Sequence, residues 1–306
     1  MSAYGVISPV RDEERFLAQT VRCMVSQSVR PIQWVLVDDG SSDRTGQIIE
    51  AAAAEHSWIK PIHRKDRGRR VAGSGVMEAF YDGYRSVTKI GWEFVVKLDG
   101  DLSFPNNYFE ECLCRFNSDP RLGIGGGTIC NEHNGFLEPE SKVDPQFHVR
   151  GATKIYRRAC WDQIGGLLCA PGWDTIDEVK ANMLGWTTRT FGDLGLVHHR
   201  RAGEAYGQWS NHVKGGRGNY IAGYHPLFMF VKCFRRLFVK PYFIGGLALW
   251  AGFLDSYFKS IPQVPDKNVV EYLRRQQINR LLGKPCLWKL GQNQERNGNH
   301  ERSLVA

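Results

Sequence analysis

The sequence lacks the signatures of several large protein classes. It contains no GxxxxGK[ST] loop of the kind that holds nucleoside triphosphates, and no GxSxG elbow of the kind that exposes a hydrolytic serine. The glycines between 123 and 127 do not form a GxGxxG segment between a strand and a helix. The apolar run at 242–254 is shorter than the roughly 20 residues that cross a bilayer, and Asp255 follows it. A nucleoside triphosphatase, a serine hydrolase of that type and a spanning helix are therefore unsupported.

The spacing of the eight cysteines gives no support to a zinc site or to a disulfide framework. No CxxC pair occurs, and no His/Cys spacing suits zinc. A chain of 306 residues can bury a full core without disulfides, so we expect buried thiols in a reducing compartment. The segment 1–14 (MSAYGVISPVRDEE) has no basic region followed by an apolar run, which a secretory signal requires. We therefore expect the protein to act in the cytoplasm.

Charge is unevenly distributed along the chain. Residues 1–197 contain 23 basic and 26 acidic side chains, whereas residues 198–306 contain 17 and 6. An excess of positive charge attracts anionic partners such as nucleic acid, anionic lipid or a phosphorylated substrate. Composition alone does not choose among these three, but it places the basic surface in the C-terminal third.

Short apolar segments alternate with segments of helical apolar spacing in the first hundred residues. Strands are predicted at 4–8, 33–38, 58–62 and 94–98, with helices near 16–25, 43–55 and 76–88. This alternation predicts an α/β fold with a mostly parallel sheet and helices on both faces. A long loop is expected from 131 to 149. In such sheets ligands bind beyond the carboxyl ends of the strands.

Acidic pairs follow two of these strands. Asp99 and Asp101 flank a glycine, and their carboxylates can together supply the oxygen ligands that Mg²⁺ or Mn²⁺ prefers. Asp38 and Asp39 are like-charged neighbours, which a pocket that hydrogen-bonds a base or a ribose would explain. Turn chemistry is the alternative for both pairs, because Asp-Gly is common in turns.

These segments, in this order, resemble the motif set of family 2 glycosyltransferases. They are 9–13 (PVRDE), 38–43 (DDGSSD) and 97–101 (KLDGD), followed by 150–152 (RGA), 164–166 (IGG) and Asp174 eleven residues before Gly185. The resemblance covers residues 4–200 and implies a GT-A fold. It also implies inverting transfer of a sugar from a nucleotide-sugar donor, a UDP-sugar, to an acceptor hydroxyl. A nucleic-acid partner is not expected.

The resemblance assigns the nucleotide contacts. Pro9, Glu13 and Asp39 match positions that hold uracil and ribose in such enzymes. Arg67 and Arg70 lie in a basic loop similar to the segment that contacts the donor diphosphate, and guanidinium groups bind phosphate oxygens bidentately. A solvated basic loop is the alternative for each arginine.

The resemblance also assigns the metal ligands. Asp99 and Asp101 would hold Mg²⁺ or Mn²⁺, and Asp99 would also lie against the donor. His198 and His199 stand where the family commonly has a histidine that completes the metal site, and a neutral imidazole is a suitable ligand. A structural hydrogen-bonding role is the alternative for either histidine.

An inverting transfer needs a carboxylate that removes the proton of the acceptor hydroxyl. The Glu-Asp doublet of the family reads Trp173-Asp174 here, which makes Asp174 the candidate base. Asp177 and Glu178 follow three and four residues later and share a helical face with it. Asp177 is the alternative base if Asp174 only caps the helix.

The composition changes near residue 200. We expect a catalytic domain of residues 1–200 and a basic, aromatic-rich helical region of residues 201–306. The apolar run at 242–254 favours contact with an anionic membrane in the plane of its surface, and a helical hairpin packed on the catalytic domain or in a dimer interface is the alternative. Membrane contact would place the protein on the cytoplasmic face, with a lipid-linked acceptor in cell-surface polysaccharide or glycan biosynthesis.

Two other functions fit parts of the sequence. A sugar-phosphate nucleotidyltransferase shares an αβα sandwich and a metal carboxylate, but it needs a Gly-rich basic loop where this chain has PVRDE at 9–13. A non-catalytic nucleotide-sugar-binding membrane module would lack the acceptor-side carboxylates. The Gln-x-x-Arg-Trp signature of processive polysaccharide synthases is missing, so we expect single additions.

Overall fold

One sheet runs through the first two thirds of the chain. The computed structural model describes residues 2–68, 74–87, 91–133, 136–141, 144–200 and 207–289. The strands of these residues are β1 (Tyr4–Val10), β2 (Gln33–Asp38), β3 (Ile59–His63), β4 (Phe94–Leu98), β5 (Leu102–Ser103), β6 (Leu122–His133), β7 (Phe136–Pro139), β8 (Thr153–Arg157) and β9 (Thr187–His198). They form one nine-stranded sheet in the order β3-β2-β1-β4-β8-β6-β9-β5, with β7 paired to β6.

The first four strands form the parallel part of the sheet that the sequence predicts. The later strands are mixed. β8 runs antiparallel to both β4 and β6, while β6 and β9 are parallel to each other. Part of the expected loop at 131–149 is strand, because β6 extends to His133 and β7 follows it. Every residue of β7 is exposed. The strand therefore has no buried face, and no alternation of apolar and polar residues marks it in the sequence.

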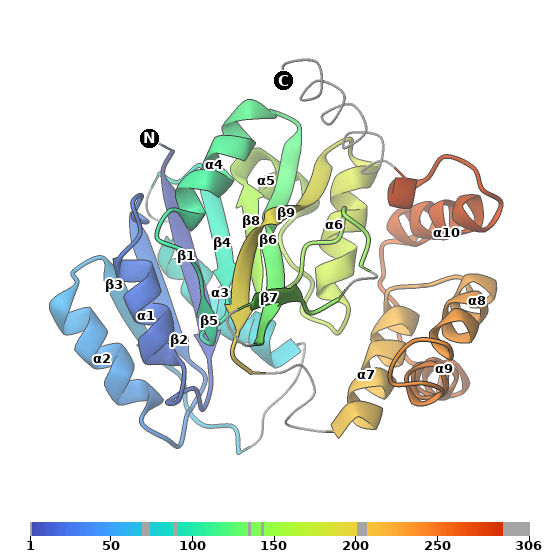
Figure 1. Ribbon diagram of the computed structural model, residues 1–306, viewed down its shortest axis with the longest axis horizontal. Coiled ribbons are helices and arrows are strands. Elements are labelled where there is room, and N and C mark those ends of the chain that lie inside the picture. Colours follow the sequence, from blue (N-terminus) through green and yellow to red (C-terminus); the bar gives the residue numbers. More distant parts are fainter. Residues whose placement is uncertain are drawn as a thin grey trace.

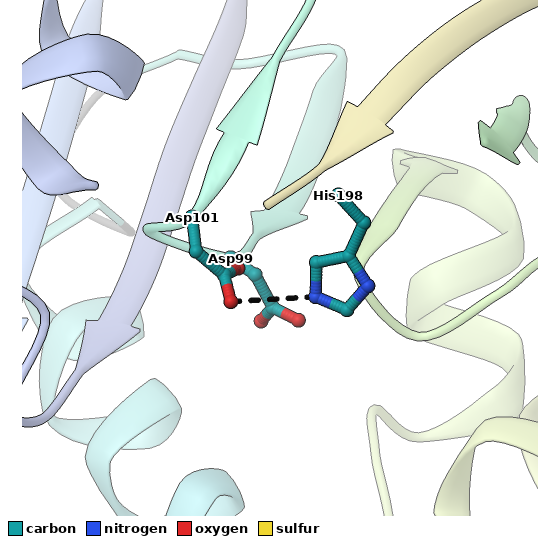
Figure 2. Close-up of side chains that lie close together, drawn as sticks. All are labelled: Asp99, Asp101 and His198. Carbon is teal, nitrogen blue, oxygen red and sulfur yellow. Dashed lines mark ion pairs between the residues drawn. The ribbon is translucent and has the colours of Figure 1, made fainter. Parts of the chain in front are cut away.

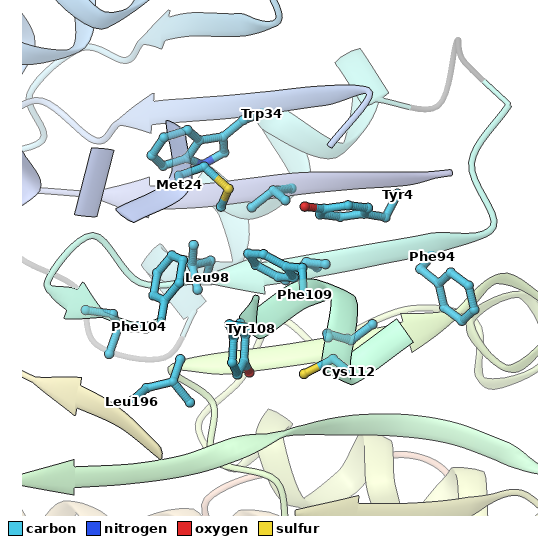
Figure 3. Close-up of a cluster of buried hydrophobic side chains, with 14 of the residues drawn as sticks. Tyr4, Met24, Trp34, Phe94, Leu98, Phe104, Tyr108, Phe109, Cys112 and Leu196 are labelled. Atoms are coloured by element: carbon cyan, nitrogen blue, oxygen red, sulfur yellow. The ribbon is translucent and has the colours of Figure 1, made fainter. Parts of the chain in front are cut away.

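Helices cover both faces of the sheet, as predicted (Figure 1). On one face lie α1 (Leu17–Val25), α2 (Thr45–Glu55) and α4 (Tyr108–Ser118), and on the other lie α3 (Ser74–Val87), α5 (Arg158–Ile164) and α6 (Trp173–Met183). The first face buries a core that includes Trp34 and Phe109 (Figure 3). The second buries another that includes Phe80 and Trp161. The expected α/β architecture is confirmed.

Among the described residues, four helices follow α6 and form the expected C-terminal appendage (Figure 1). They are α7 (Gly207–Ile221), α8 (Pro226–Arg236), α9 (Ile244–Phe258) and α10 (Lys267–Leu281). α7 and α9 cross closely, since a Cβ atom at Gly216 would lie 2.0 Å from the carbonyl oxygen of Leu249. Their core also takes in Ile176 and Val179 of α6. No helix in the described ranges is both long and apolar enough to span a membrane. The domain boundary at residue 200 stays a prediction.

A buried ion cluster joins α6 to the sheet. Lys154 of β8 is fully buried, and its Nζ lies 2.9 Å from Oδ2 of Asp177 and 2.8 Å from Oε1 of Glu178. Tyr156, on the same face of β8, donates its hydroxyl to Asp177 over 2.6 Å. His148 Nδ1 lies 2.9 Å from the other oxygen of Glu178. We call these five residues the Lys154 cluster.

The pKa values of the cluster follow from its low-dielectric surroundings. Burial and the adjoining charge of Glu178 raise the pKa of Asp177 to about 6, although Lys154 acts to lower it. Burial alone would lower the pKa of Lys154, but the adjoining carboxylates outweigh burial and raise it. Burial would likewise lower the pKa of His148, and Glu178 raises it instead. The cluster therefore keeps its cations charged.

Removing the ammonium group should destabilise the fold strongly. We expect Lys154→Met to lower the free energy of unfolding by about 3–5 kcal/mol, because two buried carboxylates lose their shared cation. Urea unfolding followed by circular dichroism measures the difference. Lys60→Met, at an exposed lysine of β3, is the control and should change stability by under about 0.5 kcal/mol. Similar values for the two variants would show that the cluster contributes little.

The cluster also predicts how stability depends on pH. The pKa of His148 lies above its usual value of 6.5 in the fold, so the folded state holds its proton to higher pH than the unfolded state does. This contribution is complete below 6.5 and is lost as the pH rises through the folded pKa. The wild type should therefore exceed His148→Gln in stability most at pH 6 and least at pH 9. A constant difference across this range would contradict the ion pair.

Candidate active site

Three candidate metal ligands meet at the carboxyl ends of the strands (Figure 2). Asp99 follows β4, Asp101 precedes β5, and His198 ends β9. Antiparallel pairing of β5 with β9 sets Leu102 opposite His198, which brings the imidazole beside the aspartates. Its Nε2 lies 3.3 Å from Oδ2 of Asp101. One ligand atom from each of the three residues lies within 4.8 Å of the others, so the group can surround one small cation.

The electrostatics of this group favour a cation. Burial raises the pKa of Asp99. The charge of Lys97, whose Nζ contacts Oδ1 of Asp99, acts to lower it. Burial would also raise the pKa of Asp101, but the hydrogen bond and charge of His198 lower it. Burial would lower the pKa of His198, whereas the hydrogen bond to Asp101 raises it to about 10. The protonated ring of His198 thus supplies a positive charge beside the two aspartates. A metal ion bound to the neutral ring would supply that charge instead.

A second carboxylate lies behind the imidazole. Oε2 of Glu140 is 3.9 Å from Nδ1 of His198 and 2.8 Å from a guanidinium nitrogen of Arg150. Carboxylates in this position commonly fix the ring orientation of a ligating histidine. Among the described atoms, Nδ1 of His198 is buried and has no hydrogen-bond partner within bonding distance. The ring therefore has a carboxylate on each side.

His199 points elsewhere. Its Nε2 lies 2.6 Å from Oγ of Ser103, and its ring stacks on Phe16 with centroids 5.5 Å apart. Only its backbone serves the site, through an N–H donated to the carbonyl of Asp101 over 3.0 Å. Neighbouring residues of an extended strand point to opposite sides. The structure thus brings three of the four predicted ligands together and leaves His199 in a packing position.

The predicted nucleotide contacts lie at the ends of β1 and β2. Pro9 pairs in register with Val37, and the backbone N–H of Asp39 donates to the carbonyl of Val10 over 2.8 Å. Glu13 is buried, and its Oε2 lies 2.7 Å from Arg200. Arg200, which follows the histidine pair directly, was not singled out from the sequence. To place Arg200 from the sequence, one would have to know that β9 ends near the carboxyl ends of β1 and β2.

Asp39 holds two arginines of the basic loop. Arg64 contacts its Oδ1 over 2.6 Å, and Arg67 contacts its Oδ2. Two carboxylates of α3 hold the same guanidinium groups, Asp82 at 2.7 Å from Arg64 and Glu78 at 2.6 Å from Arg67. Arg67 thus lies beside Asp39, and its contact with a diphosphate stays a prediction. Arg64, in the same loop, was missed because charge density alone does not show which arginine points inward.

The loop that carries these arginines passes very close to Gly40. A Cβ atom on Gly40, whose φ is +75°, would lie 2.5 Å from Cα of Asp66, so only glycine permits this approach. Arg70, the other predicted diphosphate contact, lies outside the described residues. The DDG motif therefore supplies both the carboxylate that holds the arginines and the space that their loop needs.

The two candidate bases occupy different surroundings. Asp174, in the first turn of α6, is partly exposed, and no described group hydrogen-bonds to its carboxylate. A Cβ atom at Gly151 would lie 3.5 Å from Cβ of Asp174, and Lys97 donates to the carbonyl of Gly151 over 2.6 Å. Asp177 is buried within the Lys154 cluster, where both of its oxygens accept hydrogen bonds.

The family model described as glycosyl transferase family 2 matches residues 5–169. Solved structures similar to the chain include the mannosyltransferase PcManGT from Pyrobaculum calidifontis in complex with GDP-Man and Mn²⁺, at a TM-score of 0.52 and 17% identity over 88% of this chain and 78% of that one. TarS 1–349 of S. aureus in complex with UDP-GlcNAc gives 0.51 and 15% over 90% and 81%. At such identities these likenesses show the GT-A fold alone.

Curated relatives match over shorter lengths. Glycosyltransferase AglD of Haloferax volcanii is 25% identical over 219 residues, or 65% of this chain and 31% of that protein. Glycosyltransferase GlyG of Streptococcus pneumoniae is 29% identical over 64 residues, or 21% of each chain. The matches thus span less than a third of these relatives. Since the family model covers more than half of the chain and the fold agrees with it, this protein belongs to glycosyl transferase family 2.

Proposed function

We propose that this chain transfers a sugar, with inversion and one unit at a time, from a UDP-sugar to an acceptor hydroxyl, using Mg²⁺ or Mn²⁺. The observation that supports it most is the group of Asp99, Asp101 and His198 at the carboxyl end of β4, the strand that pairs with β1. Its two carboxylates and one imidazole suit a divalent cation. Such a cation would hold the donor diphosphate and offset the negative charge that develops on the leaving nucleotide.

In this proposal the nucleotide lies over the ends of β1 and β2. Pro9 and the carboxylates of Glu13 and Asp39 hold the uracil and ribose, since carboxylates accept hydrogen bonds from ring N–H and hydroxyl groups. Arg67, and Arg70 in the segment not described, contact the diphosphate. TarS was solved with UDP-GlcNAc and PcManGT with GDP-Man and Mn²⁺, so the fold accommodates nucleoside diphosphate sugars.

We assign the general base to Asp174 rather than Asp177. A base must reach the acceptor hydroxyl and must have a free oxygen to accept its proton. Asp174 is partly exposed in the first turn of α6 and lies beside Gly151. Lys97 donates to the carbonyl of Gly151 and also contacts the carboxylate of Asp99. Asp177 is 4% exposed, and Lys154 and Tyr156 occupy its oxygens. Of the two histidines, we assign the third metal ligand to His198.

The acceptor in this proposal is a lipid-linked glycan at an anionic membrane surface. The support is the basic character of residues 198–306, with 17 basic and 6 acidic side chains, together with the position of the C-terminal helices against α6. Cell-surface polysaccharide or glycan assembly on the cytoplasmic face of the membrane is the corresponding pathway.

The metal assignment predicts a specific loss of activity. Asp101→Asn should abolish the EDTA-sensitive release of UDP from a UDP-sugar panel, because the site loses a charged ligand. Asp193→Asn, at an exposed acid of β9 that pairs with Arg115 and not with a residue of the site, is the control and should retain activity. Full turnover by Asp101→Asn, or by the wild type after thorough chelation, would refute the metal role.

The base assignment predicts a different pattern. Asp174→Asn should lower kcat by about 10²–10⁴-fold, as expected for lost general-base catalysis, and should leave the calorimetric affinity for the donor unchanged. Asp177→Asn should instead lower the unfolding temperature, because it disturbs the Lys154 cluster. If Asp174→Asn transfers sugar normally while a folded Asp177→Asn does not, the base lies one turn further along α6. If both remain active, the inverting mechanism is wrong.

A further inference from the structure

Large apolar side chains are exposed mainly in the C-terminal helices. Of the large hydrophobic residues exposed within the described ranges, only Ile32, Phe136, Leu137 and Leu184 precede residue 207. Those on and between α8 and α9 are Leu227, Phe230, Phe234, Phe238, Val239, Tyr242, Phe243, Ile244, Leu247, Tyr257 and Phe258. Such a concentration exceeds the scattered apolar exposure that is normal on soluble proteins.

These side chains lie on a helical hairpin and on the connection between its helices. α8 and α9 pack side by side, since a Cβ atom at Gly246 would lie 2.6 Å from the carbonyl oxygen of Cys233. Phe230 contacts Trp250 across the hairpin, with ring centroids 5.9 Å apart. Phe234 contacts Phe238 at 5.5 Å, which joins α8 to the connection between the helices. We call the connection 237–243, with its exposed rings, the hairpin tip.

The rings at the tip are among the most exposed of the chain. Phe238 is 64% exposed, Phe243 is 61% and Tyr242 is 55%. Leu247 lies one turn after Phe243 on α9 and is also exposed. Burying a large apolar side chain contributes roughly 1.5–3 kcal/mol, so leaving several exposed together indicates a partner surface.

The charges along α8 and the hairpin tip are all of one sign, and the acid of α9, Asp255, is paired with Lys259. No aspartate or glutamate occurs from residue 207 to residue 243, whereas Lys214, Arg217, Lys232, Arg235, Arg236 and Lys240 fall in this stretch. Arg235 precedes the tip, Lys240 lies within it, and both are exposed. Neither has a carboxylate within ion-pair distance in the described part of the chain. The surface therefore complements an anionic partner.

These observations favour a lipid surface over a second copy of the chain. A two-fold interface would place the same patch on both sides, so Arg235 and Lys240 would meet cations of the partner and repel them. An anionic bilayer offers phosphates to the cations and hydrocarbon to the rings. α9 has 15 residues and, at about 1.5 Å per residue, is shorter than the roughly 30 Å hydrocarbon layer.

We propose that the hairpin tip and the exposed faces of α8 and α9 insert into the interface of an anionic bilayer and hold the protein on it. The rings of Phe238, Tyr242 and Phe243 enter the boundary between headgroups and acyl chains. Arg235 and Lys240 bind the lipid phosphates. This inference deepens the proposed function, on which it rests for the lipid-linked acceptor.

Vesicle flotation of the full-length protein tests this surface. Vesicles of phosphatidylcholine with 30% phosphatidylglycerol, a composition chosen to be about one-third anionic, are compared with pure phosphatidylcholine vesicles. Arg235→Gln with Lys240→Gln should weaken binding to the anionic vesicles about 25-fold, from about fivefold for each cation. Phe238→Ser with Phe243→Ser should weaken it at least about tenfold on both vesicle types.

Matched controls lie outside α8, α9 and the hairpin tip. Lys60→Gln removes an exposed cation and Leu184→Ser an exposed apolar side chain, and both should bind vesicles as the wild type does. All variants should keep the wild-type unfolding temperature and UDP release from the donor. If the wild type released no UDP from any donor, the proposed function would be refuted. Vesicle binding would still test this inference separately.

Two outcomes would overturn the inference. The first is equal binding of the tip variants and the wild type to both vesicle types. The second is a light-scattering result in which Phe238→Ser with Phe243→Ser converts a dimer to a monomer without changing vesicle binding, which would assign the surface to a second copy of the chain.

Discussion

One buried ammonium group sets the position of α6, the helix that carries the proposed base Asp174. Lys154 contacts two consecutive carboxylates of α6 and also donates to the carbonyl of Asp174 over 2.6 Å. Removing any of these partners would leave a buried charge uncompensated. All the contacts therefore form only when α6 lies at one rotation about its own axis and at one distance from β8. That placement buries Asp177 and Glu178 and leaves Asp174 at the edge of the site.

The same helix connects the sheet to the C-terminal helices. Trp173 and Ala181 of α6 belong to the core under the sheet, whereas Ile176 and Val179 belong to the core of α7 to α10. Docking of the α8–α9 hairpin on a bilayer would therefore hold α6, and with it Asp174, at a fixed orientation to the membrane. A lipid-linked acceptor arrives at the membrane surface, so this arrangement would meet it with the proposed base.

Local patterns predicted the fold and the location of the site, because apolar runs ended by acidic pairs mark strands whose carboxyl ends bind ligands. They did not separate residues whose roles depend on which way a side chain points. His198 and His199 are adjacent, and the register of β5 with β9 decides which one faces the aspartates. Asp174 and Asp177 are one turn apart, and Lys154, distant in sequence, decides which one is buried. Neither long-range contact leaves a signal in the local sequence.

The charge pairs of the site bear on how a donor would bind. Asp39 is paired with Arg64 and Arg67, and Glu13 with Arg200. If the carboxylates hold the nucleoside and the arginines hold the diphosphate, binding exchanges these pairs for contacts with the donor and leaves each charge with a partner. A nucleoside alone would engage the carboxylates while leaving the guanidinium groups without phosphate. Because a buried charge that loses its partner is costly, this exchange favours a ligand that carries both the nucleoside and the diphosphate over a nucleoside alone.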